Sequence, residues 1–191
     1  MSESFKPVSI KTVPSFNRPG LFQAINRCLS KENREQFIGL VLVDVKNFTS
    51  LNRIFDYCHG DVILYHVYQR LCELAADSNL VFRCGSDEFA LVVPDLENGS
   101  NIVLIADQAV NQLREPFIWR GKEFNYDINI GCVALPTKSA DPVQLLNSAE
   151  HLLQKAKIQK RAMMFGTEVQ QQDDDYVWSL EQDLLRALHN N

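Results

Sequence analysis

A continuous run of aliphatic and β-branched residues is the feature that most limits how this chain can fold. The run extends from Phe37 to Val45 and contains one carboxylate, Asp44, next to its C-terminal end. A half-exposed strand alternates apolar and polar residues, whereas a continuous apolar run is typical of a central strand covered on both faces. We therefore expect a sheet flanked by helices, with the carboxylate of Asp44 at the end of a central strand.

Apolar residues at helical spacing lie on both sides of this run. Helices are expected at residues 21–29, 49–55, 61–75 and 100–113, the last capped by Ser100, with a turn at residues 56–60. A final helix begins at Asp141, an acidic N-cap followed by Pro142 and Gln144. Its inward face is expected to carry Val143, Leu146, Ala149, Leu153 and Ala156, and its exposed basic end to carry Lys155, Lys157, Lys160 and Arg161.

Two β-hairpins are expected between the helices. The first joins residues 80–84 to 89–93 through a polar tip of Gly, Ser, Asp and Glu, and closes at Pro94. The second joins residues 117–119 to 124–134. The resulting order does not alternate strand and helix as a doubly wound parallel sheet does. The expected class is α/β, or α+β by stricter usage, with a mixed sheet.

Composition excludes several classes of protein. The 191 residues are 46% hydrophobic and 23% charged, which is typical of a globular chain with one core. A net charge of -5 argues against a nucleic-acid-binding surface. The cysteines (Cys28, Cys58, Cys72, Cys84 and Cys132) show no CxxC pair or zinc spacing and are expected to be reduced. Without a signal peptide or membrane span, the expected location is cytoplasmic, although a longer parent protein could have a membrane anchor.

Two acidic segments are candidates for metal chemistry. Asp44 ends the central strand, and Asp87 with Glu88 occupies the tip of the first hairpin. Carboxylates that converge at a sheet edge suit Mg²⁺ or Mn²⁺, which bind through one or two carboxylates and substrate phosphates. Taken singly, Asp and Glu are ordinary turn residues, so the combination carries the hypothesis.

Three motifs in register resemble a known family. They are Arg-Cys-Gly-Ser-Asp-Glu-Phe-Ala-Leu at residues 83–91, Asp-Val-Lys-Asn-Phe-Thr-Ser-Leu-Asn at 44–52 with Gly-Asp at 60–61, and Ala149, Leu153, Ala156, Lys157 and Arg161 downstream. Together they resemble the GGDEF domain of the diguanylate cyclases over about residues 17–165. The resemblance implies a central mixed, largely antiparallel five-stranded sheet flanked by helices, the palm fold of nucleotidyl cyclases.

The resemblance also implies roles for individual residues. Asp44, the carbonyl of Val45 and Asp87 would hold two Mg²⁺ or Mn²⁺ ions for each GTP, and Glu88 would support them on the turn of Gly85 and Ser86. The substrate-binding residues would be Phe48, Asn52, Asp61, Lys157 and Arg161. Asn52 and Asp61 would recognise guanine, whose N1 and N2 donors suit a carboxylate, while Lys157 and Arg161 would bind phosphates.

The family's reaction joins two GTP molecules into cyclic di-GMP. Each 3′-hydroxyl attacks the α-phosphate of the other GTP, and pyrophosphate leaves with the assistance of two metal ions. Because each domain holds one GTP, the resemblance implies that two GGDEF domains meet as a homodimer.

The chain departs from the family at several positions. Ser86 replaces the second glycine of the signature, which costs about 1 kcal/mol if that position requires a positive φ. Alternatively, the small side chain fits and its hydroxyl donates to a phosphate. Thr49 replaces a phosphate-facing lysine, and Asn17 and Arg18 are all that remains of an N-terminal motif that helps to position the turn. The Arg-x-x-Asp motif of the inhibitory product site is absent from residues 76–79, so feedback by cyclic di-GMP is not expected.

The expected organisation is an N-terminal lead-in at residues 1–16, a GGDEF domain at 17–168, a linker at 169–175 and a helix at 176–191. That helix resembles the one that enters an EAL phosphodiesterase domain, which suggests a fragment of a two-domain protein. Two hypotheses stay open: a diguanylate cyclase of full or weak activity, and a catalytically silent GTP-binding module that regulates an attached EAL domain. A scaffold without nucleotide ranks last, and a P-loop motif is absent.

Overall fold

The computed structural model describes residues 14–30, 36–55 and 57–167, without the side chains of residues 52–59, 122 and 167. The expected linker and helix after residue 168, and most of the N-terminal lead-in, lie outside the described residues. Within the described part of the chain, no helix combines the length and the apolar character needed to cross a membrane.

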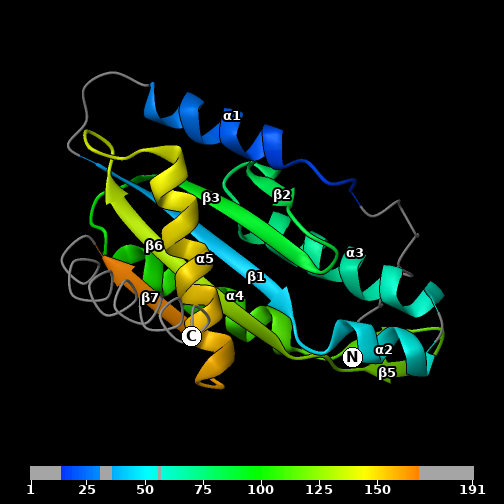
Figure 1. The fold of residues 1–191 in the computed structure, drawn as a ribbon. Coiled ribbons are helices and arrows are strands. Elements are labelled where there is room, and N and C mark those ends of the chain that lie inside the picture. Colours follow the sequence, from blue (N-terminus) through cyan, green and yellow to red (C-terminus); the bar gives the residue numbers. More distant parts are fainter. Residues whose placement is uncertain (1–13, 31–35, 56, 168–191) are drawn as a thin grey trace, which may run out of the picture.

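A five-stranded sheet forms the centre of the molecule, in the order β2-β3-β1-β6-β7 (Figure 1). Its strands are β1 (Phe37–Val45), β2 (Val81–Arg83), β3 (Glu88–Leu96), β6 (Ile128–Pro136) and β7 (Met163–Thr167). All neighbours pair antiparallel except β6 and β7, which are parallel. The predicted mixed, largely antiparallel five-stranded sheet and its class are therefore confirmed, and the apolar run from Phe37 to Val45 is its central strand.

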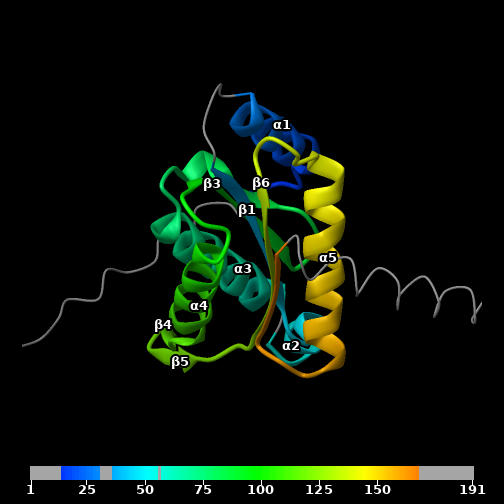
Figure 2. The same cartoon turned by 90° about the vertical axis from the view of Figure 1, so that its left-hand side faces the viewer.

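Helices cover both faces of this sheet, as Figure 2 shows. They are α1 (Arg18–Leu29), α2 (Phe48–Phe55), α3 (Tyr57–Leu74), α4 (Asn101–Arg114) and α5 (Pro142–Ile158), with a short 3-10 turn at Ser78–Leu80. Alternate residues of β1 serve the two layers: Val41 and Val43 pack in the cluster that includes α3 and α4, and Leu40 and Leu42 pack in the cluster of α1 and α5. The continuous apolar run thus follows from burial on both sides.

Helix α5 lies directly on β6. A Cβ atom added to Gly131 would lie 2.3 Å from the backbone nitrogen of Leu153 and 2.4 Å from the carbonyl oxygen of Ala149. The predicted start of α5 is confirmed, because the Asp141 side chain accepts from the backbone N–H of Gln144 at 2.9 Å. Val143, however, is 52% exposed. At about 100° per residue it lies roughly 120° from Ala149, the centre of the buried stripe.

Two predicted boundaries are wrong because tertiary packing outweighs local turn signals. The expected turn at residues 56–60 is largely helical, since α3 begins at Tyr57 and the glycine at position 60 is buried within it. Strand β3 continues through Pro94 to Leu96. The β1–β3 pairing shifts register between Phe37 and Gly39, so the missing N–H of Pro94 falls in an interruption of the ladder.

The second hairpin is shorter than expected. Strands β4 (Phe117–Trp119) and β5 (Lys122–Phe124) form a separate two-stranded sheet, and β6 begins only at Ile128. The loop residues Arg120 and Gly121 have φ values of 51° and 74°, which match a two-residue type I′ turn. Ser100 makes no side-chain cap on α4, contrary to expectation. The Asn98 side chain accepts from the Ser100 N–H instead.

The cysteines whose side chains are described (Cys28, Cys72, Cys84 and Cys132) are thiols and form no disulfide, in agreement with the expected reduced state.

Candidate functional site

Three polar side chains form a row across the sheet where β1 ends. The strand register places Asp44 of β1 opposite Glu88 of β3 and opposite Asn129 of β6. Alternation along the strands turns this row to the face covered by α1 and α5, because the intervening Val43, Phe89 and Ile130 pack in the opposite cluster. Asp44 and Asn129 are both buried, although the residues farther along the strands on this face are apolar.

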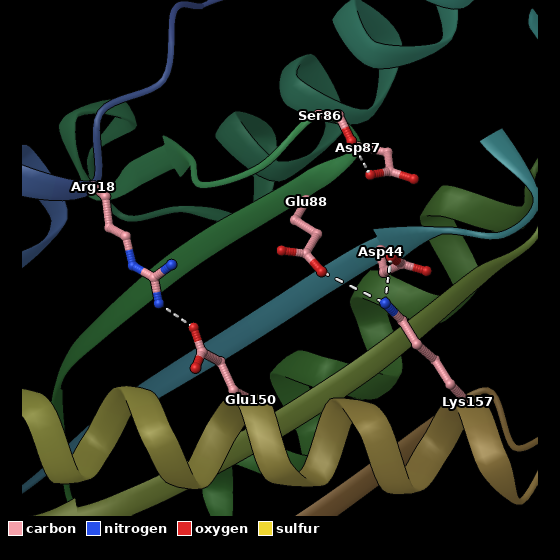
Figure 3. A network of polar contacts seen from close by, with 7 residues as sticks. All are labelled: Arg18, Asp44, Ser86, Asp87, Glu88, Glu150 and Lys157. Carbon is pink, nitrogen blue, oxygen red and sulfur yellow. Dashed lines mark hydrogen bonds and ion pairs between the residues drawn. The ribbon is translucent and has the colours of Figure 1, made fainter. Parts of the chain in front are cut away.

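Lys157, near the C-terminal end of α5, points into this row (Figure 3). Its Nζ lies 2.6 Å from Oδ1 of Asp44 and 3.5 Å from Oε1 of Glu88. The expectation that Lys157 is fully exposed is therefore wrong, because α5 lies close enough to β6 for the side chain to reach the sheet. One cation thus links the motif of β1, the signature turn and the last helix.

Burial and charge shift the protonation of this pair. Burial raises the pKa of Asp44, and the negative charges of Asp87 and Glu88 act in the same direction, while Lys157 opposes them. Partial burial disfavours the Lys157 ammonium, but the hydrogen bond and charge of Asp44, with the charge of Glu88, raise its pKa overall. The three carboxylates therefore sense one another, and the site attracts cations.

Arg83 organises the signature turn between β2 and β3. Its Nε donates to the carbonyl of Gly85 at 3.1 Å, and its Nη2 donates to the carbonyl of Ser86 at 2.6 Å. The guanidinium also lies over the ring of Phe16, 4.9 Å from the centroid, and the carbonyl of Arg83 accepts from the N–H of Asn17. The remnant of the N-terminal motif therefore still contacts the base of the turn.

Gly85 and Asp87 connect the turn to the sheet. The N–H of Val45 donates to the Asp87 carbonyl at 3.1 Å, which fixes the turn beside the end of β1. A Cβ atom on Gly85 would lie 2.9 Å from Oε2 of Glu88 and 3.1 Å from its Cβ. Glycine at this position thus leaves room for the Glu88 side chain to approach Lys157.

Ser86 adopts no strained backbone. It is not among the described residues with positive φ, so the cost that a left-handed conformation would impose is absent. Its hydroxyl donates to Oδ1 of Asp87 at 2.5 Å. The structure therefore accommodates Ser86, but its hydroxyl engages Asp87, a carboxylate that is predicted to bind metal.

The donor set at this edge fits a small divalent cation. Asp44, Asp87 and the Val45 carbonyl are hard oxygen ligands, and Val45 contacts the Asp87 backbone directly. The described residues contain no ready cluster of three or more His, Cys, Asp or Glu ligands. This arrangement suits Mg²⁺, which takes one or two carboxylates and completes its shell with phosphates and water.

The residues predicted to bind guanine are only partly described. The Asn52 side chain lies outside the described residues, although its backbone belongs to α2. Asp61 is exposed on α3. Burial lowers the pKa of Arg83, and the negative charges of Asp61 and Asp87 partly oppose this shift. Phe48 begins α2 and is buried in the core, so it supports that helix from below.

Arg161 does not lie on the same helix face as Lys157, contrary to expectation. Helix α5 ends at Ile158, and Lys160 follows with a φ of 54°. The N–H of Arg161 donates to the carbonyl of Ala156 at 3.0 Å, as in a Schellman C-cap. Arg161 is exposed beyond this cap. A left-handed cap without glycine or asparagine carries little sequence signal. The sequence pattern therefore does not show that α5 ends before Lys160 and Arg161.

Asn129 was not recognised from the sequence. Its Nδ2 donates to the carbonyl of Arg161 at 2.7 Å and thereby joins β6 to the loop after α5. The available signal was a single amide residue inside the apolar stretch from Ile128 to Leu135.

Comparison with known proteins agrees with this architecture. The chain is 28% identical over 156 residues to diguanylate cyclase TpbB of Pseudomonas aeruginosa, a match that covers 80% of this chain and 35% of that protein. It is 26% identical over 145 residues to diguanylate cyclase DgcN of Escherichia coli, covering 75% and 35%, and 25% identical over 177 residues to cyclic di-GMP phosphodiesterase PdeR of the same organism, covering 92% and 26%. The matched region spans between about a quarter and a third of the length of these relatives.

A solved structure supports the same assignment. The GGDEF domain of YfiN, or TpbB, from P. aeruginosa superposes with a TM-score of 0.72 at 25% identity, covering 78% of this chain and 94% of that one. Residues 15–163 match the family described as diguanylate cyclase, GGDEF domain. The chain belongs to the GGDEF domain family of diguanylate cyclases.

Proposed function

We propose that this domain binds GTP with Mg²⁺ or Mn²⁺ and joins two GTP molecules into cyclic di-GMP. The observation that carries the proposal is the ion-pair cluster of Lys157, Asp44 and Glu88, because its members come from three separate motifs. A charged cluster at the end of a central strand, held next to a rigid turn, is suited to phosphate and metal chemistry.

The residues of the chain would share the work as follows. Asp44, Asp87 and the Val45 carbonyl would hold the metal ions, which neutralise phosphate charge and lower the pKa of the attacking 3′-hydroxyl. Lys157 would exchange part of its contact with Asp44 for a phosphate oxygen. Arg161 would supply a second cation to the phosphates.

The partners of this reaction follow from its stoichiometry. Asn52 and Asp61 would select guanine over adenine, since adenine lacks the donors at N1 and N2 that a carboxylate accepts. Each domain would hold one GTP, so catalysis requires a second GGDEF domain opposite the first.

A second candidate function is a catalytically silent GTP-binding module that regulates an attached EAL-type domain. The observation that favours it is the hydrogen bond from the Ser86 hydroxyl to Oδ1 of Asp87, which occupies an oxygen that metal would need. The similarity to a cyclic di-GMP phosphodiesterase over 92% of this chain points the same way.

Two measurements separate these functions. The protein at high concentration is incubated with GTP and Mg²⁺ or Mn²⁺, and the nucleotides are separated by chromatography. Calorimetry with a non-hydrolysable GTP analogue is run in parallel. Formation of cyclic di-GMP supports the cyclase, and binding without product supports the silent module. No binding at millimolar analogue refutes both.

Replacement of Ser86 by glycine tests the second candidate directly. Ser86→Gly removes the hydroxyl from Asp87, so we expect turnover to rise by about fivefold to tenfold, the equivalent of one hydrogen bond. Ser100→Gly is a matched control, since its hydroxyl makes no cap bond on α4. If Ser86→Gly is as inactive as the parent, Thr49 or the altered N-terminal segment limits activity instead.

A further inference from the structure

Two of the contacts that hold the loop after α5 in place come from β6. Asn129 donates its side-chain amide to the carbonyl of Arg161 at 2.7 Å, and the N–H of Ile130 donates to the carbonyl of Ala162 at 2.8 Å. The second contact belongs to the β-ladder and does not depend on a side chain. The first depends entirely on the residue at position 129.

This contact is directional and partly shielded from water. Asn129 itself is only 4% exposed, so its amide competes little with solvent, and losing this partner is costly for the amide and the carbonyl. Lys160, immediately before Arg161, has a φ of 54°, a conformation that costs a non-glycine residue about 1 kcal/mol or more. A strained loop persists only where neighbouring contacts hold it, and the amide of Asn129 is one of these.

Asn129 also lies next to the site itself. It is the direct cross-strand partner of Asp44, whose Oδ1 binds Lys157. Asn129 therefore lies next to Asp44, the candidate metal ligand. It also anchors the loop that carries Arg161, the second candidate phosphate ligand.

We propose that Asn129 is a positioning residue that holds Arg161 beside the Asp44 row and so sets the affinity of the site for the phosphates of GTP. The inference rests on the GTP-binding function proposed above. It assigns Asn129 no contact with the nucleotide. Its effect passes through the backbone of Arg161, which makes it separable from a general contribution to stability.

A double-mutant cycle tests this route. We compare the parent, Asn129→Ala, Arg161→Gln and the double variant by calorimetry with a non-hydrolysable GTP analogue and Mg²⁺. We expect Asn129→Ala to weaken binding by about fivefold to tenfold in the parent background, as for the loss of one buried hydrogen bond. In the Arg161→Gln background the same change should weaken binding by less than about twofold, because the residue it positions is gone.

Matched variants exclude loss of fold as the explanation. Asn111→Ala removes an amide that bonds to Asp107 on the exposed side of α4, and should leave the affinity unchanged. Asn129→Ser, whose hydroxyl is too short to reach the Arg161 carbonyl, should reproduce the effect of alanine with a smaller cavity. Without nucleotide, hydrogen exchange at the Arg161 amide should quicken by about tenfold in both position-129 variants.

The outcomes are distinct. Equal losses of affinity in the parent and Arg161→Gln backgrounds, or no loss in the parent, overturn this inference and leave GTP binding intact. Absence of binding by the parent refutes the proposed function and this inference together. Unchanged exchange at Arg161 also overturns it, because the loop would then not depend on Asn129.

Discussion

Two of the ion pairs that helix α5 makes differ in burial and in location (Figure 3). Lys157 reaches down to Asp44, and the two side chains are 28% and 11% exposed. Arg18, the first residue of α1, forms an ion pair with Glu150 of α5, and those side chains are 51% and 44% exposed. The first pair lies in a row of polar groups inside the sheet, whereas the second bridges two helices at the surface.

Two ion pairs on the same helix can therefore have different roles, depending on how far each pair is buried. An exposed pair gains little because water and salt screen it. A partly buried pair has already lost much of its hydration, so its partners depend on each other and remain available for a ligand that replaces one of them.

Gly131→Ala should break both pairs at once by lifting α5 from the sheet. The new Cβ would meet the backbone of Leu153 and Ala149, which cannot rotate away. We expect a loss of about 3 kcal/mol or more in the free energy of unfolding, measured by urea denaturation. Gly121→Ala is the control: its φ is 74° but the space is open, so about 1 kcal/mol is expected. Equal losses in the two variants would contradict close packing of α5.

A titrating group on the opposite face gives an internal reference for pH. Burial, with a smaller effect from Arg70, lowers the pKa of His66 from 6.5 to about 3. His66 stacks on Phe117 at 4.2 Å, and its Nδ1 lies 3.1 Å from the Tyr126 hydroxyl. Because the unfolded chain binds a proton that the folded chain does not, stability falls as pH falls from about 6.5 towards 3.

The expected slope is about 1.4 kcal/mol per pH unit well below pH 6.5, and His66→Phe should remove it. Urea denaturation at several pH values, compared between parent and variant, measures the difference. A parallel decline in both would assign the acid sensitivity to groups other than His66. Asp44 would not be among them, because a carboxyl whose pKa is raised on folding stabilises the folded state in acid. The reference therefore separates the chemistry of the site from that of the core.

Lys157→Met tests the buried pair. It leaves Asp44 without its cation in a poorly hydrated position, and we expect a loss of about 1–2 kcal/mol in the free energy of unfolding at pH 7. The loss should shrink in acid, because burial already raises the pKa of Asp44 and protonation removes the unpaired charge. A variant as stable as the parent at pH 7 would show that the pair contributes nothing to folding.

Arg18→Met should have the smallest effect. Its pair with Glu150 is exposed, so we expect less than about 0.5 kcal/mol at low salt and no difference at 1 M NaCl. Thermal unfolding at the two salt concentrations is sufficient. A loss as large as that of Lys157→Met would mean that exposure does not distinguish the two pairs, and the comparison would fail.

Local patterns with one dominant cause were predicted well. The strand from Phe37 to Val45 has both ends as expected because every residue in it is buried or nearly so. The start of α5 at Pro142 follows from an N-cap whose side-chain bond is entirely local. Motif spacing was sufficient to identify the family, because Asp44, Asp87 and Lys157 belong to three separate motifs that match it in register.

Features that depend on two distant segments were missed. The extent of β3 beyond Pro94 depends on a register shift opposite Phe37. The separation of β5 from β6 depends on which strand each one pairs with. The position of Arg161 depends on a cap that contains a non-glycine residue in the left-handed region. In each case the local propensities were outweighed by contacts far away in the chain.

The sequence by itself therefore determined the class of sheet, the order of its main elements and the family, since periodicity and motif spacing are local properties. Only the tertiary structure decided that Lys157 turns inward to Asp44 and that Arg161 lies beyond the helix. It also decided that Asn129, opposite Asp44 in the sheet, bonds to the Arg161 carbonyl. Strand register and the close packing of α5 on Gly131 set those distances. Such geometry is a property of segments brought together from across the chain, which no single stretch of residues encodes.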